Sequence, residues 1–481
     1  MALPWPVAPP PPRPPRPLWV VALAVAIVAL LASAAVVVVV RLDRGPDHPD
    51  AWDPRVEALV AYVEEERDLD FDHPVYVDFL TPDEYSEETT AAEGSVADDE
   101  RADLDRYAGA LRALGLGSGE IDLFTAYNQV SDGGTLAFYD PESERVRVRG
   151  TEMTVGMRVT LVHELTHALQ DQHFDLDLLY DEDTDGGAAT AYRALIEGDA
   201  LRIEEAYTLD ELSSDEQADY DTEYESQLED SLDATADVPA FISAAFAIPY
   251  ALGQPFVLML ANDGGNDAVD DAFDEPPDTE DDLFDPASYL AREEDEDLDL
   301  GLPEDVEPFD EGPFGSPSWY LLLAERIDPK QAFDAALGWG GDAYAFFERD
   351  DRVCVRAGFV GDTAEDEAQM TDALDAWAEA MPGGAAERTD VDGHPGLEAC
   401  DPGEEVDMAL TGRAQDALFV PSLWGFLVAD ASTVLGADDA RCYARTVLDT
   451  LTYEQITDPE GVAFQGEEFQ ATLTEAFEAC A

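Results

Sequence analysis

HELTHALQDQH, residues 163–173, contains three of the six histidines in a chain of 481 residues. Valine and leucine recur at helical spacing through this stretch and just before it, which predicts a helix with Thr151 or Thr154 as its N-cap. His163 and His167 are four residues apart, so they lie one turn apart on the same face of that helix. Two imidazoles in this arrangement can occupy adjacent corners of a tetrahedral zinc site. The stretch therefore predicts a metal-binding helix.

Glu164 follows the first of these histidines and supplies the acid–base group that a metal-dependent hydrolase needs. A carboxylate at this position can take a proton from a zinc-activated water, because zinc lowers the pKa of that water toward 7. A catalytic zinc ion binds three protein ligands and keeps one position open. One further ligand must therefore come from outside the pair His163 and His167.

Three residues compete as the third ligand. Glu197 is the leading candidate, because it ends an apolar run on a helix predicted over residues 188–209, and a glutamate there is unusual without a buried partner. Glu204, two turns later, is a weaker candidate. His173 has the spacing of the metzincin pattern H-E-x-x-H-x-x-G-x-x-H, but Gln170 stands where that pattern has the glycine that turns the chain back.

The composition limits the class of partner. The chain has 109 acidic and 25 basic residues, a net charge of −84, and 46% hydrophobic residues. The hydrophobic fraction is enough for a packed core. The acidic surplus argues against nucleic acid as a partner, because phosphate binding needs clustered lysine and arginine. Such a surface repels itself in dilute salt and is screened in concentrated salt, which favours a halophilic protein.

Residues 18–40 carry no charge and are long enough to cross a bilayer as one transmembrane helix. A cleavable signal peptide is the alternative, with Ala32-Ser33-Ala34 as the cleavage site. Cleavage there would leave a run of valines at the new N-terminus, so we favour an uncleaved membrane anchor after a Pro-rich tail, residues 1–17. Arginines flank the segment on both sides and barely decide its orientation.

The four cysteines all lie in the last third of the chain, and none forms a C-x-x-C pair. An even number outside the cytoplasm suggests two disulfides. Of the possible pairings, Cys354 with Cys400 and Cys442 with Cys480 is the simplest. We therefore expect a single-pass protein of the cell membrane with the bulk of its chain extracytoplasmic.

Three regions follow the anchor. We expect a catalytic domain over residues 46–262, an acidic connector over 263–312, and a C-terminal α+β region over 313–481 that contains all four cysteines. Within the first region, residues 135–150 predict a strand, a turn and a strand. An extended peptide could dock by strand addition at the edge of that hairpin.

Three motifs, in this order, resemble the gluzincin clan of zinc peptidases, the Peptidase-MA-like group. HELTH is followed by IEGDA, residues 196–200, and then by PYALG, residues 249–253. The resemblance covers about residues 135–260. It implies an α+β, zincin-like fold in which the HExxH helix and a second helix carry the metal ligands.

The resemblance also assigns roles to individual residues. It implies one zinc ion per chain, held by His163, His167 and Glu197. Glu164 would be the general base. Tyr250, the tyrosine of the third motif, would stabilise the tetrahedral oxyanion.

This chain departs from the clan at two points. Thermolysin-like members place an aspartate four residues after the ligand glutamate, where this chain has Leu201. Asp171 or Asp199 would then orient a metal-binding histidine instead. The Gly-x-Met-Glu-Asn motif of the aminopeptidases is absent, so the resemblance does not imply an aminopeptidase.

The sequence thus predicts a membrane-anchored, extracytoplasmic zinc metallopeptidase that hydrolyses peptide or protein substrates. One alternative is a metzincin-type peptidase with His173 as the third ligand. The other is a catalytically inactive, peptidase-like envelope protein that binds partners. The presence of Glu164 between both histidines argues against the inactive protein.

The charge makes the first testable prediction. Raising salt from about 10 mM to about 2 M shortens the screening length from roughly 30 Å to less than about 3 Å. The free energy of unfolding of the region after the anchor should therefore rise with salt, because repulsion among acidic side chains weakens. Thermal unfolding in a salt series measures this, and equal stability at both ends would contradict halophilic adaptation.

Overall fold

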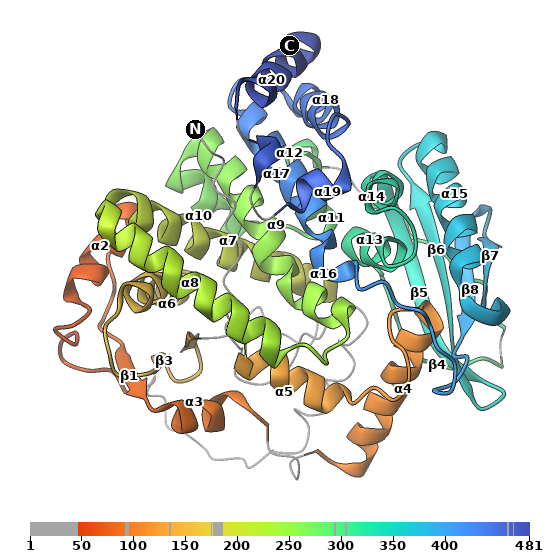
Figure 1. The fold of residues 1–481 in the computed structure, drawn as a ribbon, viewed down its shortest axis with the longest axis horizontal. Coiled ribbons are helices and arrows are strands. Elements are labelled where there is room, and N and C mark those ends of the chain that lie inside the picture. The colour runs from red at the N-terminus through yellow and green to blue at the C-terminus, as the bar shows by residue number, and fades with distance from the viewer. Residues whose placement is uncertain are drawn as a thin grey trace.

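The computed structural model describes most of the chain as an α+β protein with two sheets (Figure 1). The described residues are 47–91, 96–133, 136–174, 176, 186–292, 295–303, 305–458, 461–464 and 466–481. The expected tail, residues 1–17, and the expected membrane segment, residues 18–40, lie outside them.

The first sheet is small and mixed, with the strand order β1-β3-β2. β1 (Tyr76–Leu80) runs parallel to β3 (Arg145–Arg149), and β2 (Ala137–Asp140) runs antiparallel to β3. β2 and β3 are the predicted strand–turn–strand unit, which is confirmed. Val146 and Val148 are fully buried and alternate with partly exposed arginines, because successive side chains of a strand point to opposite faces.

The helix that carries the HELTH motif, α6 (Val155–His173), packs against this sheet and against α2 (Glu57–Arg67). The Thr154 hydroxyl accepts a hydrogen bond from the Met157 N–H at 3.2 Å, so Thr154 is the N-cap. Of the two candidates, Thr151 and Thr154, the second is therefore confirmed. Most of α6 is buried on all sides, because α7 (Gly186–Asp210) covers the face that the sheet leaves open.

α7 and α9 (Ala240–Gly264) cross in direct backbone contact. A Cβ atom placed on Gly198 would overlap the carbonyl oxygen of Gly253, and one placed on Gly253 would overlap the carbonyl oxygen of Ala194. Glycine is therefore required at both positions for the two helices to approach this closely. The glycines lie in the IEGDA and PYALG motifs, so the crossing brings these two motifs together.

By length and composition, α9 is the one helix in the described part of the chain that could cross a membrane. However, 78% of its most apolar window is buried inside the protein. α17 (Phe419–Ser432) packs along it, with Gly425 against Pro255. α9 is therefore placed as the central helix of the core.

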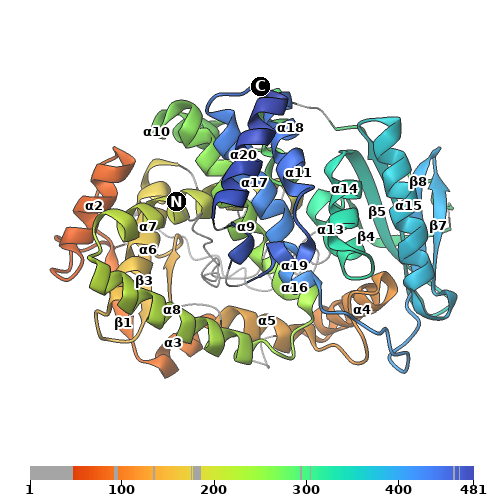
Figure 2. The same ribbon diagram turned by 45° about the horizontal axis from the view of Figure 1, so that its top comes forward.

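The second sheet is antiparallel and lies at the opposite end of the molecule from the first, on the right of both Figure 1 and Figure 2. Its strands, in the order in which they pair, are β4 (Pro308–Gly312), β5 (Trp339–Arg349), β6 (Arg352–Gly361), β8 (His394–Cys400) and β7 (Ala386–Val391). α15 (Ala364–Ala380) packs against β6, β7 and β8.

The segment expected as an acidic connector, residues 263–312, contains regular structure. It forms α10 (Asn266–Asp274), α11 (Asp281–Phe284), α12 (Pro286–Ala291) and the edge strand β4. Several of its apolar residues, among them Phe273 and Phe284, are buried in one hydrophobic core that extends from Tyr107 to Ala476. The acidic residues around them dominated the composition and hid this amphipathic pattern.

Both expected disulfides are present and join neighbouring elements. Cys354 and Cys400 lie directly opposite each other on β6 and β8. Cys442 and Cys480 join α18 (Ala437–Leu448) to α20 (Glu467–Cys480), which lie side by side in Figure 1 and Figure 2. The simplest of the possible pairings is therefore confirmed.

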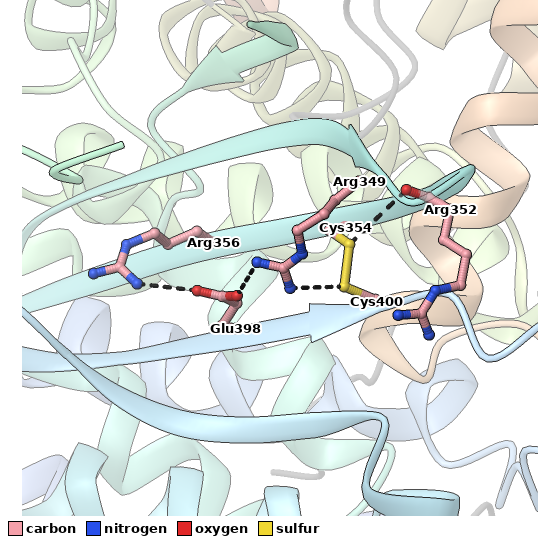
Figure 3. Close-up of a disulfide and its surroundings, with 6 residues drawn as sticks. All are labelled: Arg349, Arg352, Cys354, Arg356, Glu398 and Cys400. Carbon is pink, nitrogen blue, oxygen red and sulfur yellow. Dashed lines mark hydrogen bonds and ion pairs between the residues drawn. A yellow bond between two sulfur atoms is a disulfide. The ribbon is translucent and has the colours of Figure 1, made fainter. Parts of the chain in front are cut away.

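Charged side chains surround the disulfide between the strands (Figure 3). Arg349 and Arg356 both bind Glu398, at 2.7 Å and 3.1 Å. The guanidinium of Arg349 also lies 3.2 Å from the sulfur of Cys400. The two arginines thus balance the charge of Glu398, and Arg349 also contacts the disulfide.

The glycine crossing makes a prediction about stability. Gly198→Ala should destabilise the protein by on the order of 3 kcal/mol, because a methyl group forces two packed backbones apart. Gly436→Ala is the control, since Gly436 has a φ of −74° and no atom of the residues that the structure describes lies within 4 Å of the place that its new methyl group would occupy. Denaturant unfolding measures both variants, and equal losses of stability would contradict the close crossing.

Candidate metal centre

α6 and α7 bring His163, His167 and Glu197 together in the interior. The three residues are buried, and one ligand atom of each lies within 4.8 Å of the others. This is the group that the sequence predicted, and it could hold a metal ion. It is formed because the histidine face of α6 packs against the face of α7 that carries Glu197.

The distances within the group fit a tetrahedral metal site. Oε2 of Glu197 lies 3.3 Å from Nε2 of His163 and 3.3 Å from Nε2 of His167. Ligand atoms at about 2.0–2.1 Å from a tetrahedral zinc ion are about 3.3 Å apart. Nε2 of His167 is buried and has no hydrogen-bond partner among the described residues, although the carboxylate oxygen is close. A metal ion would satisfy this nitrogen.

The other ring nitrogen of each histidine has its own partner. Nδ1 of His163 lies 3.0 Å from Oε2 of Glu204, and Nδ1 of His167 lies 2.9 Å from Oε1 of Gln170. Both partners accept hydrogen bonds, so with a metal bound each Nδ1 would keep its proton and each Nε2 would offer its lone pair. Such acceptors behind metal-binding histidines fix the ring orientation and raise the basicity of the ligand.

Asp199 supports His167 indirectly, through Gln170, and not by the direct contact that was expected. Its carboxylate accepts a hydrogen bond from Gln170 Nε2 at 3.0 Å, and Gln170 in turn contacts the histidine. Arg67 and Arg202 each donate to Asp199 at 2.9 Å. Burial opposes the charge on Asp199, but these arginines outweigh it and lower the pKa of Asp199. A charged network thus extends from the ring of His167 to α2.

Glu164, the expected base, is 1% exposed. Its Oε2 accepts a hydrogen bond from the Tyr139 N–H of β2 at 2.7 Å. Burial raises the pKa of Glu164 above its ordinary value. The hydroxyl of Tyr139 donates to Asp171 at 2.7 Å. Asp171 was expected to orient a histidine, but this contact supports the strand beside Glu164.

Tyr250 reaches the same group from α9. Its buried hydroxyl donates to Oε1 of Glu197 at 2.7 Å. Arg193, one turn before Glu197 on α7, donates to the same oxygen at 3.3 Å. The structure thus brings Tyr250 into the site, with its hydroxyl on a candidate metal ligand.

His173 lies outside the group, and its expected role as an alternative third ligand is not supported. It is exposed at the end of α6, where its Nε2 lies 2.9 Å from the carbonyl oxygen of Asp70. Because Gln170 occupies the position of the metzincin glycine, α6 continues to His173 without turning back. The structure favours Glu197 as the third ligand.

The charges in the group support one another. Burial opposes the charge on His163, but hydrogen bonds with Glu197 and Glu204 outweigh it and raise the pKa of His163 to about 10. Burial also opposes the charge on Glu197, yet His167 and His163 hold the pKa of Glu197 well below its ordinary value. The carboxylates thus favour positive charge at this position, which a divalent cation provides.

The supporting roles of Glu204, Gln170 and Arg193 were not predicted from the sequence. Simple helix spacing contains the signal for each of them. Glu204 is seven residues after Glu197, Gln170 is three after His167, and Arg193 is four before Glu197. All three therefore share a helix face with a ligand. Leu201 has no hydrogen-bonding side chain, and Glu204, three residues later, contacts His163 instead.

Comparison with protein-family models found no match, and comparisons with curated proteins and with solved structures found none either. The geometry of the group is therefore the main support for any function of this chain.

The partners of the histidines make a prediction about metal affinity. Glu204→Ala and Gln170→Ala should each weaken metal binding by about 10- to 100-fold, because each leaves a ligand imidazole without its acceptor. His173→Ala should leave the affinity unchanged. Competition with a coloured chelator measures all three, and a loss with His173→Ala alone would overturn the assignment of ligands.

Proposed function

We propose that this protein is a zinc-dependent metallopeptidase with a zincin-like catalytic domain. The observation that carries the proposal is the convergence of two histidines and Glu197 on one buried point, with Glu164 beside them. Two nitrogens and one carboxylate oxygen are the ligand set of catalytic zinc in thermolysin-type enzymes. The order of the HELTH, IEGDA and PYALG motifs, which resembles the gluzincin clan, supports the same function.

The residues around the group suit peptide hydrolysis. Zinc held by His163, His167 and Glu197 would act as a Lewis acid toward water and toward the substrate carbonyl. Glu164 would take the proton of the attacking water, and its raised pKa suits it to hold that proton. The same carboxyl group then protonates the leaving amine. By the resemblance, Tyr250 would stabilise the oxyanion of the tetrahedral intermediate.

We propose that the protein works outside the cytoplasm, anchored by residues 18–40. The two disulfides support this location, because disulfides persist in oxidising compartments.

The base makes the prediction that tests this function. Glu164→Gln should retain the metal and lower the rate of hydrolysis of a labelled unfolded protein by about 10²- to 10⁴-fold, because an amide cannot accept the proton. Glu152→Gln, at an exposed position before α6, is the control. Metal content and hydrolysis are measured in concentrated salt.

Full activity of Glu164→Gln would refute the assigned base. Metal binding by the parent without hydrolysis of any unfolded protein would instead favour the inactive, partner-binding alternative.

A further inference from the structure

Two buried donors share one oxygen of Glu197. The Tyr250 hydroxyl lies 2.7 Å from Oε1, and Nη2 of Arg193 lies 3.3 Å from it. Tyr250 is 1% exposed and Arg193 is 7% exposed, so water does not compete for this oxygen as it would at the surface. A hydrogen bond between a charged group and a buried carboxylate is among the stronger ones in proteins.

The other oxygen of Glu197 faces the histidines. Oε2 lies 3.3 Å from both Nε2 atoms, at the separation of neighbouring ligands around a metal ion. The carboxylate is thus divided, with Oε2 on the metal side and Oε1 on the side of the two donors. For bidentate binding, Oε1 would have to leave both donors and approach the metal as well.

The division is built into the crossing of α7 and α9. Arg193 precedes Glu197 by one helical turn, and Tyr250 precedes Gly253 by three residues. The backbone contact between Gly198 and Gly253 fixes α9 against α7 next to both donors. The donors therefore stand on rigid elements, which is the condition for accurate positioning of a ligand.

We propose that Arg193 and Tyr250 are positioning residues that hold Glu197 as a monodentate metal ligand. The inference rests on the proposed metal site and deepens it. With one oxygen from Glu197, the protein supplies three ligand atoms, so the metal keeps room for water and a substrate carbonyl. In the free enzyme, the hydroxyl of Tyr250 serves Glu197, which is a different role from oxyanion stabilisation.

The test uses the full chain in detergent, loaded with cobalt(II) in place of zinc. Cobalt absorbs visible light more strongly in four-coordinate than in five-coordinate sites, so its spectrum reports the binding mode without any substrate. The variants are Tyr250→Phe, Arg193→Gln and the double substitution, with Tyr62→Phe as the control. Tyr62 is remote in sequence, and within the described part of the chain its hydroxyl has no hydrogen-bond partner.

The parent and the control should show the strong four-coordinate spectrum. The double variant should lose visible absorption intensity as Oε1 joins the metal. Its metal dissociation constant should rise by about 10- to 100-fold, because the ligand loses its supporting partners. Arg193→Lys, which keeps a charged donor, should deviate less than Arg193→Gln.

Two outcomes would overturn the inference, and they differ in their meaning for the proposed function. A folded double variant with the parent's spectrum and affinity would show that the two donors do not set the binding mode, while the metal site stands. A folded parent that binds no cobalt or zinc would remove the metal site and the inference together.

Discussion

A carboxylate buried in a protein core is costly unless both of its oxygens have partners, and Glu197 meets this requirement by dividing its two oxygens between different groups. Oε1 accepts from Tyr250 and Arg193, whereas Oε2 faces the imidazoles of α6. A cation between this oxygen and the two nitrogens would complete the second half of the arrangement. Glu197 thus connects the histidines of α6 to the donors on α7 and α9.

The surrounding fold serves to hold that side chain in place. α6 is fixed by the first sheet, α7 lies on α6, and α9 is fixed on α7 by direct contact between Gly198 and Gly253. Behind the histidines, Glu204 is itself bonded at 3.3 Å by Tyr220 of α8 (Ser214–Ala234), and Asp199 is bonded by Arg67 of α2. Five helices, α2, α6, α7, α8 and α9, thus each contribute a side chain to the support of the site.

Patterns that are local in sequence predicted much of this structure. Helix and strand periodicity decide which face a residue occupies. For this reason the spacing of the histidines and the apolar run that ends at Glu197 predicted the buried group, and the alternating residues before them predicted the hairpin. The simplest cysteine pairing was also correct. Residues 263–312 were harder, since acidic residues hid an apolar face. The partners of Asp171 and Asp199 depend on contacts between distant segments, which no spacing rule supplies.

The most direct test of the proposed site is the location of the metal. Crystals of the zinc-loaded protein would be measured on both sides of the zinc absorption edge. We expect one anomalous peak per chain, about 2.0–2.1 Å from Nε2 of His163, Nε2 of His167 and Oε2 of Glu197. A map of folded, zinc-treated protein with no peak at this point, or with its peak at His173, would contradict the proposed site.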